Sequence, residues 1–186
     1  MHADGYAGFE KLYQTGRIRE VACMAHVRRN FVDVQQSAIS HGGSAIAEEA
    51  IMRIAQLYAV EKEARGSSPE ERMRLRQLKA KPVLDDLEPW LGVQLTWISG
   101  KTPLAEAIRY ALTRIKRLRP YLDHGFLELD NNTAERGMRA IAIGRKNWLF
   151  AGSERGGRSA AIVYTLIETA KLNGVDPQAW LTDVLS

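Results

Sequence analysis

The sequence lacks a second cysteine, a long uninterrupted apolar stretch and any internal repeat. Its single cysteine, Cys23, excludes an intramolecular disulfide framework and is typical of a reducing compartment. No apolar run approaches the roughly 18 residues that a bilayer span needs. The opening residues, Met1 to Asp4, do not have the pattern of a signal peptide. These absences predict a cytoplasmic protein with no membrane partner.

A strong excess of charge of one sign is also missing. The 186 residues include 26 Lys and Arg against 22 Asp and Glu, which gives a net charge of +4. The excess lies in the C-terminal half: residues 109–119 hold five cations and no acid, and residues 136–158 hold six cations and one acid. The composition therefore allows a polyanion such as DNA as a partner without requiring one.

The first two thirds of the chain are predicted to be mainly helical. A short helix is expected around residues 6–13, followed by a strand over Ile18–Met24 and a helix from Ala25. Between Ser44 and Leu122 the apolar spacing is helical throughout. It predicts a helix that ends at Gly66, one that starts in the capping box 68–71 and is kinked or ended by Pro82, and one that runs from Pro103 to Pro120.

The remaining residues predict three further helices around a basic loop. Asp130, Asn131 and Asn132 form a strong helix-start signal, and the helix is expected to continue to about Ile141. Residues 144–159 indicate a basic, glycine-containing loop, followed by helices over 160–172 and after Pro177. The fold class is therefore mainly α with a small β component.

Several side chains have both a structural and a functional interpretation. Glu135 has the spacing to close a capping box with Asn132, or, beside basic side chains, to hold a divalent cation next to a phosphate. Cys23 and His26 lack the further ligands that a zinc site needs, and a Cys-His nucleophilic pair would lack an orienting partner. Arg145 and Lys146 precede aromatic residues, a combination that suits phosphate contact with base stacking, or a buried apolar anchor with solvated cations.

Long sequence strings spread over nearly the whole chain resemble the insertion-sequence-66 family of bacterial DDE transposases. These strings are ADGYAGF at 3–9, CMAHVRRNF at 23–31, LDNNTAER at 129–136, IGRKNWLFAGS at 143–153 and TLIETAKLNGVDP at 165–177. Their number and their order along the chain make the resemblance specific.

The resemblance implies a ribonuclease-H-like α/β catalytic domain that binds transposon-end DNA and uses Mg²⁺ for strand cleavage and transfer. Asp4 would be the second of three catalytic, metal-binding carboxylates and Glu135 the third. Cys23 and His26 would be the Cys-x-x-His pair of the family, a local structural element or one at the DNA end. The domain organisation expected is a ribonuclease-H-like remnant over 1–40, a helical insertion over 41–124, and a C-terminal part of the core with tail helices over 125–186.

The first catalytic aspartate of the family would lie upstream of Asp4, so the sequence predicts a partial, incomplete transposase that is inactive alone. Arg136, Arg139, Arg145 and Lys146 are the expected DNA-binding residues. An alternative is a non-enzymatic DNA-binding or regulatory fragment that joins transposon ends, a full-length transposase or a second copy of itself. A helical protein-interaction domain without DNA contact is a third hypothesis, which requires the cations to be scattered over several faces.

Overall fold

The computed structural model describes residue 8 and residues 10–39, 44–144 and 152–186, and these residues are mostly helical. The chain divides into two compact units, Met1–Asn131 and Asn132–Ser186. The predicted mainly α character is thereby confirmed.

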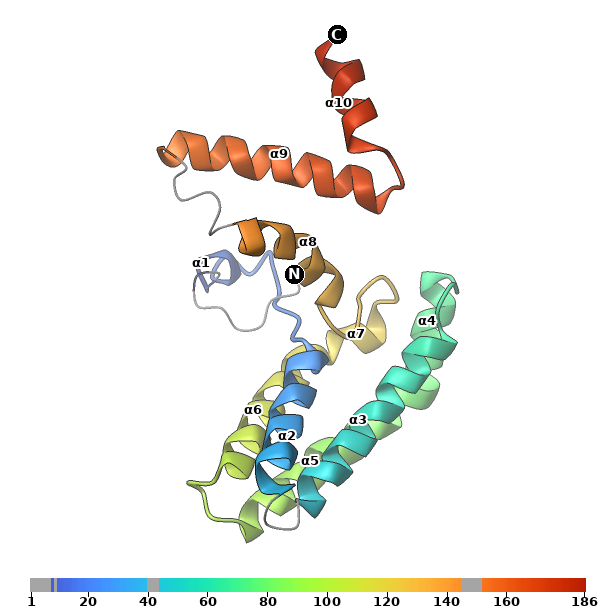
Figure 1. Ribbon diagram of the computed structural model, residues 1–186. Helices are drawn as coiled ribbons and strands as arrows, with labels where there is room; N and C mark the ends of the chain where they lie inside the picture. The colour runs from blue at the N-terminus through green and yellow to red at the C-terminus, as the bar shows by residue number, and fades with distance from the viewer. Residues whose placement is uncertain (1–7, 9, 40–43, 145–151) are drawn as a thin grey trace. The chain divides into compact units, whose positions relative to one another are not determined.

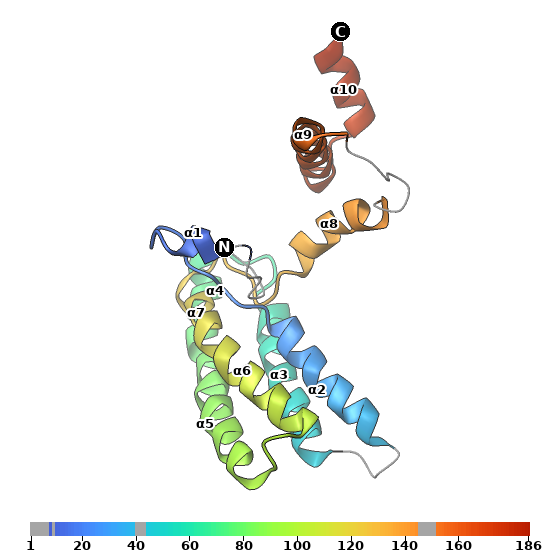
Figure 2. The same cartoon turned by 90° about the vertical axis from the view of Figure 1, so that its left-hand side faces the viewer.

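Four long helices form the first unit. They are α2 (Met24–Ala38), α3 (Ala45–Glu63), α5 (Lys81–Trp97) and α6 (Pro103–Leu118). Helix α2 packs against α3 and α6, and α5 packs against the same two helices, so that the four close into a bundle (Figures 1 and 2). The fully buried side chains of all four helices share one core, which includes Phe31, Ile54, Leu57, Leu87, Leu91, Ile108 and Ile115.

The helix starts in this unit follow from their capping residues. The Ser44 and Thr102 side chains accept hydrogen bonds from the backbone N–H groups of Ala47 and Ala105. Ser68 and Glu71 form a complete capping box at the start of α4 (Pro69–Leu75). Each cap satisfies backbone donors that have no partner within the helix, which explains why these boundaries were predictable.

The sequence predicted that Pro82 kinks or ends the helix, but the helical chain continues through this residue. Helix α4 continues through the π-helical turn η3 (Arg76–Ala80) directly into α5, which carries Pro82 in its first turn. The Lys81 N–H donates to the Arg76 carbonyl, five residues earlier. Because a proline is tolerated at the start of a helix and the π turn resets the hydrogen-bond register just before it, the helical rod continues.

Arg76, on η3, is the largest fully buried side chain of the unit. Its guanidinium donates to both carboxylate oxygens of Glu61 at 2.7 Å, and to the carbonyls of Tyr121 and His124 at 3.1 and 3.2 Å. It also lies 4.8 Å from the centre of the Tyr121 ring. Arg76 thus ties η3 to α3 and to the segment that contains α7 (Pro120–Asp123).

Residues 18–24 do not form the predicted strand. Val21 makes an isolated bridge, and α2 already begins at Met24. The Ala22 N–H donates to the Arg117 carbonyl at 3.4 Å and the Met24 N–H to the Leu129 carbonyl at 3.1 Å. These donors therefore bond to the end of a helix and to a loop. The ranges that the structure describes contain no β-strand, and the ribonuclease-H-like character stays a prediction.

The predicted short helix near the start is present only as α1 (Glu10–Tyr13), and the earlier part of the predicted range lies outside the described residues. In the second unit, α8 (Asn132–Gly144) and α10 (Pro177–Leu185) agree with the sequence prediction. The loop predicted over 144–159 is wrong at Gly144, which is the last residue of α8, and from Glu154 onward, where α9 (Glu154–Leu172) starts. Residues 145–151 of this range lie outside the described residues. The Ser153 side chain caps this helix through the Gly156 N–H, which offsets the low helix propensity of Gly156 and Gly157.

The second unit has little core of its own. Helices α9 and α10 contact one another but contain no buried residue. Large apolar side chains are exposed along both helices, among them Ile162, Val163, Leu166, Leu172, Val184 and Leu185. No helix in the described part of the chain is sufficiently long and apolar to pass through a bilayer.

Candidate functional site

Glu135, the predicted third carboxylate, lies in the first turn of α8 and is exposed. Because this helix begins at Asn132 itself, Glu135 is its fourth residue, one position beyond the spacing of a capping box. A carboxylate in a first helical turn interacts favourably with the helix dipole. Asp4, the predicted partner of Glu135, lies outside the described residues, so its proximity to Glu135 stays a prediction.

The segment that leads into α8 is held to the start of α2 by two hydrogen bonds that backbone N–H groups donate. The Met24 N–H donates to the Leu129 carbonyl at 3.1 Å, and the Asn131 N–H donates to Cys23 Sγ at 3.5 Å. The Leu129 side chain is buried in the core of the first unit. The backbone three residues ahead of α8 is thus fixed on the bundle by both polar and apolar contacts.

A third contact to this segment comes from α3. The Tyr58 hydroxyl donates to a carboxylate oxygen of Asp130 at 3.2 Å. Burial raises the pKa of Tyr58, and the nearby Asp130 carboxylate raises it further, so the phenol remains a hydrogen-bond donor at neutral pH. We call this set of contacts, made by Cys23, Met24, Tyr58 and residues 129–131, the α8 anchor.

The Cys-x-x-His pair is part of the same region. Cys23 is fully buried at the N-cap position of α2, and His26 lies half-buried in the first turn. Burial raises the pKa of the Cys23 thiol, an effect that the backbone N–H of Asn131 partly opposes. A buried thiol held neutral in this way packs and accepts a weak hydrogen bond, which suits a structural role better than a nucleophilic one.

A metal site is not complete within the described residues alone. Among them, no group of three His, Cys, Asp or Glu side chains lies close enough to hold an ion. Glu135 nevertheless supplies an exposed carboxylate, and hard oxygen donors are the ligands that Mg²⁺ prefers. A magnesium site that includes Glu135 therefore requires ligands from outside the described part of the chain, and Asp4 is the predicted one.

The predicted DNA-binding cations fall into two groups. Arg136 and Arg139 are exposed on α8, and Arg136 donates to the Thr133 hydroxyl at 3.1 Å. Arg145 and Lys146 lie outside the described residues. The structure therefore leaves the first two available on one helix and does not place the other two.

Most of the basic cluster over 109–119 is used inside the first unit. Arg117 pairs with Glu20, and Arg119 pairs with Asp85 and Glu88 at 2.8 Å. Two further cations bond within the unit: Arg109 donates to the Gly100 carbonyl at 2.7 Å, and Arg114 lies 4.8 Å from the centre of the Tyr110 ring. Counting charges along the sequence therefore overstated the number of cations in this cluster that can contact a polyanion. Lys116 alone in the cluster has no ion-pair or hydrogen-bond partner among the described residues.

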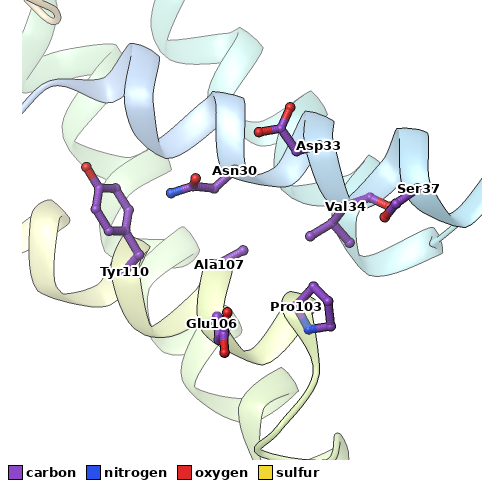
Figure 3. A pocket seen from close by; sticks show the side chains of 8 residues that line it. All are labelled: Asn30, Asp33, Val34, Ser37, Pro103, Glu106, Ala107 and Tyr110. Carbon is purple, nitrogen blue, oxygen red and sulfur yellow. The ribbon is translucent and has the colours of Figure 1, made fainter.

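A hollow of about 510 Å³ lies between α2 and α6 (Figure 3). It is lined by Asn30, Asp33, Val34, Ser37, Pro103, Glu106, Ala107 and Tyr110. Figure 3 shows the Tyr110 ring rising from α6 toward α2, while the Asp33 carboxylate points away from α6. The lining includes two carboxylates and no cation, so this hollow disfavours a phosphate ligand.

Sequence reasoning missed Tyr58 and Leu129 as parts of the site. Tyr58 reads as one member of the apolar stripe of its helix, and nothing in the local sequence shows that its hydroxyl meets Asp130, 72 positions later. Leu129 is recognisable as apolar, but its backbone contact with Met24 depends on the tertiary fold.

Comparison with known proteins matches this chain to two family models. The model described as "Transposase IS66 family" matches residues 1–159, and the model described as "IS66 C-terminal element" matches residues 165–186. No solved structure shows significant similarity to the chain.

Three curated relatives come from Sinorhizobium fredii (strain NBRC 101917 / NGR234). The uncharacterized proteins y4hP and y4jD are each 39% identical to this chain, and the uncharacterized protein y4qI is 41% identical. Each alignment covers 100% of this chain but only 36%, 37% and 35% of the respective relative. The chain thus spans little more than a third of the length of these relatives.

Proposed function

Since this chain belongs to the IS66 transposase family, we propose that it forms part of the catalytic core of a DNA transposase. In this proposal Asp4 and Glu135 are two of the carboxylates that hold Mg²⁺ at the scissile phosphate. Transposon-end DNA is the substrate, and the reaction is strand cleavage and transfer. The observation that carries the proposal is the family match over both long segments of the chain.

The α8 anchor supports the role of Glu135. Catalytic groups act efficiently only when they are held in place before the substrate arrives. Asp130 and Asn131, which are bonded to α3 and α2, precede Glu135 by only five and four residues. The backbone that precedes the helix with Glu135 is therefore held within the first unit up to Asn131.

The chemistry of phosphoryl transfer explains why carboxylates are required. Asp4 and Glu135 would hold divalent metal, which when bound would supply activation of the attacking oxygen and charge stabilisation of the leaving oxygen. The residues of this chain would supply negatively charged oxygen ligands, and the cations of α8, Arg136 and Arg139, would face the phosphate backbone of the substrate.

We expect the 186-residue chain by itself to show no strand cleavage. The family resemblance implies three carboxylates, and the matching positions in this sequence supply two, Asp4 and Glu135. Incubation of the purified chain with supercoiled plasmid DNA and Mg²⁺ or Mn²⁺ should therefore leave the plasmid intact. If the wild-type chain nicks the plasmid and Glu135→Gln does not, the expectation is wrong, and the chain holds a competent site without a third carboxylate of the family.

The proposal is tested by metal binding. We expect Mn²⁺, followed by the relaxation of water protons, to bind the wild-type chain, and Asp4→Asn and Glu135→Gln each to weaken binding at least about tenfold. Glu70→Gln is the matched control, because Glu70 is also an exposed glutamate in the first turn of a helix. Equal affinities for wild type, Asp4→Asn and Glu135→Gln would contradict the proposal.

A non-enzymatic DNA-binding or regulatory fragment is the second candidate. Lys116, which is exposed and has no partner among the described residues, favours DNA contact that needs no metal. Such a fragment would occupy transposon ends or join a full-length transposase. It predicts DNA binding in EDTA that is unchanged by Glu135→Gln, together with no Mn²⁺ site at all.

A further inference from the structure

A second cleft, of about 870 Å³, lies in the first unit between residues 10–20 and the end of α6. One wall includes Tyr13, Arg19 and Glu20, and the other includes Lys116 and Arg117 in the last turn of α6. The two walls are joined by the ion pair between Arg117 and Glu20 and by the hydrogen bond from the Ala22 N–H to the Arg117 carbonyl. The cleft is therefore built from two segments with direct contacts between them.

Cations outnumber carboxylates around this cleft. The residues that line it include three cations, Arg19, Lys116 and Arg117, against Glu10 and Glu20. Glu20 is neutralised by Arg117, whose side chain nevertheless stays 47% exposed. The cleft thus carries a net positive charge, in contrast to the hollow between α2 and α6.

Two hydrogen-bond donors of the cleft are not used within the described structure. The Lys116 amine has no partner among the described residues. The Tyr13 hydroxyl is buried and is likewise unpartnered there. Burial, with Glu20 as the next cause, raises the pKa of Tyr13, so this hydroxyl remains a donor at neutral pH. A phosphate oxygen would accept hydrogen bonds from both groups.

We propose that this cleft binds the phosphate backbone of duplex DNA, with Lys116 as a direct phosphate contact and Tyr13 as a hydrogen-bond donor. The proposal extends the proposed function, on which it rests for the choice of DNA as the polyanion. Cations on both walls, Arg19 on one and Lys116 and Arg117 on the other, suit a ligand that carries one negative charge per about 1.7 Å of helix axis better than a single phosphate ion. No base-reading pair is involved, so binding is independent of DNA sequence.

The cleft also begins close to the proposed catalytic carboxylate in the sequence. Glu10, at one edge of the cleft, follows Asp4 by six residues. Six residues span at most about 21 Å, which equals roughly six nucleotides of one DNA strand at about 3.4 Å each. A duplex whose scissile phosphate lies at Asp4 can therefore reach the cleft with its flanking backbone.

The test is DNA binding by the purified chain in EDTA, measured by fluorescence anisotropy with a labelled 20-base-pair duplex of arbitrary sequence. Lys116→Ala should weaken binding about eightfold at 0.1 M salt and make the slope of log K against log salt less negative by about 0.9, the values for one lost phosphate contact. Tyr13→Phe should weaken binding with an unchanged salt slope, because no charge is lost.

Lys101→Ala is the matched control. Lys101 is also exposed and unpartnered among the described residues, but it precedes the first turn of α6 and lies outside the cleft. About 14 helical residues, or roughly 20 Å, separate the two lysines along α6. Lys101→Ala should bind DNA as the wild type does. Equal losses for both alanine variants, or no loss for Lys116→Ala, would overturn the proposal.

Two further arms separate the possible outcomes. Inorganic phosphate at 10 mM added at constant ionic strength should compete poorly with the duplex; strong competition would show that the cleft recognises a free phosphate and would overturn the DNA assignment. The loss of DNA binding in Lys116→Ala needs no metal, so it can be compared with the Mn²⁺ binding experiment. If Lys116→Ala weakens DNA binding but Asp4→Asn and Glu135→Gln leave Mn²⁺ affinity unchanged, the cleft is retained and the proposed metal site is rejected. If only the Mn²⁺ result is as expected, the cleft alone is rejected.

Discussion

The Tyr58 hydroxyl on α3 donates a hydrogen bond to Asp130, 72 positions later and two residues before α8. The contact connects the middle of the helical bundle to the backbone that leads to Glu135. Since the Asn131 N–H also bonds to Cys23, the last residues of the first unit are held from two helices. The helical bundle therefore holds the last residues of the first unit, up to Asn131, which precede the helix with the proposed carboxylate.

Tyr58→Phe should lower the free energy of unfolding by about 1 to 2 kcal/mol, because it removes a hydrogen bond to a carboxylate and keeps the ring in place. Urea denaturation at pH 7 measures the change. Tyr13→Phe is the control, since the Tyr13 hydroxyl has no partner among the described residues, and its stability should change little. A Tyr58→Phe variant as stable as the wild type would show that the contact does not hold the segment.

Stability should fall at alkaline pH through the buried tyrosines. Burial raises the pKa of Tyr58 and of Tyr121 above the ordinary value of 10.0. Above that value the unfolded chain loses these protons while the folded chain keeps them, so the free energy of unfolding decreases as the pH rises. Each group contributes up to about 1.4 kcal/mol per pH unit.

Urea titrations between pH 8 and pH 11 test this expectation. Tyr121→Phe should be about as stable as the wild type at pH 7, because its buried hydroxyl is unpartnered in the described structure. The variant should then lose less stability than the wild type above pH 10. Parallel pH profiles for the two proteins would mean that Tyr121 ionises normally in the folded state.

Arg76→Met should destabilise the first unit by about 3 kcal/mol or more, because it removes the two shortest hydrogen bonds to the mostly buried Glu61 carboxylate and the donor to the buried Tyr121 carbonyl. Lys79→Met is the matched control: Lys79, also on η3, pairs with Glu63 on α3, but both side chains are exposed. The control should change the free energy of unfolding by less than about 1 kcal/mol. Similar losses for the two variants would contradict the structural role of Arg76.

Two Gly→Ala substitutions should have opposite effects. A Cβ at Gly125 would lie 1.7 Å from the Pro69 carbonyl oxygen, and a Cβ at Gly92 on α5 would meet nothing within 4 Å. Gly125→Ala should therefore destabilise by at least about 1 to 3 kcal/mol, and Gly92→Ala should stabilise by roughly 0.5 to 1 kcal/mol. Thermal unfolding of the two variants distinguishes them, and a stable Gly125→Ala protein would refute the close packing of residues 69 and 125.

The helix boundaries were predictable wherever a local chemical signal sets them. Ser44, Ser68, Thr102 and Asp176 each accept a backbone hydrogen bond at the start of a helix. The errors arose where tertiary structure decides. Residues 18–24 have the alternation of a strand, but their backbone donors find partners on α6 and near α8, which no local pattern reveals.

The site was predictable in its residue types and less so in its environment. Glu135 lies in a first helical turn, as the Asn-rich start signal implied. Charge counting along the sequence failed for residues 109–119, because it ignores the carboxylates that the fold brings to Arg117 and Arg119. The cleft at Lys116 was missed for the same reason: its two walls are about a hundred residues apart in the sequence.

The central claim is that Asp4 and Glu135 converge on shared cations. Two ions about 4 Å apart, each about 2.1 Å from its ligands, place the two carboxylates within about 8 Å of one another. Spin labels on Ala3→Cys and Ala134→Cys, in a Cys23→Ala background with Mg²⁺ present, measure this proximity by pulsed electron resonance. The account predicts a label separation below about 20 Å once the two label side chains are included. A single population with a clearly longer separation, in a protein whose circular dichroism matches the wild type, would contradict it.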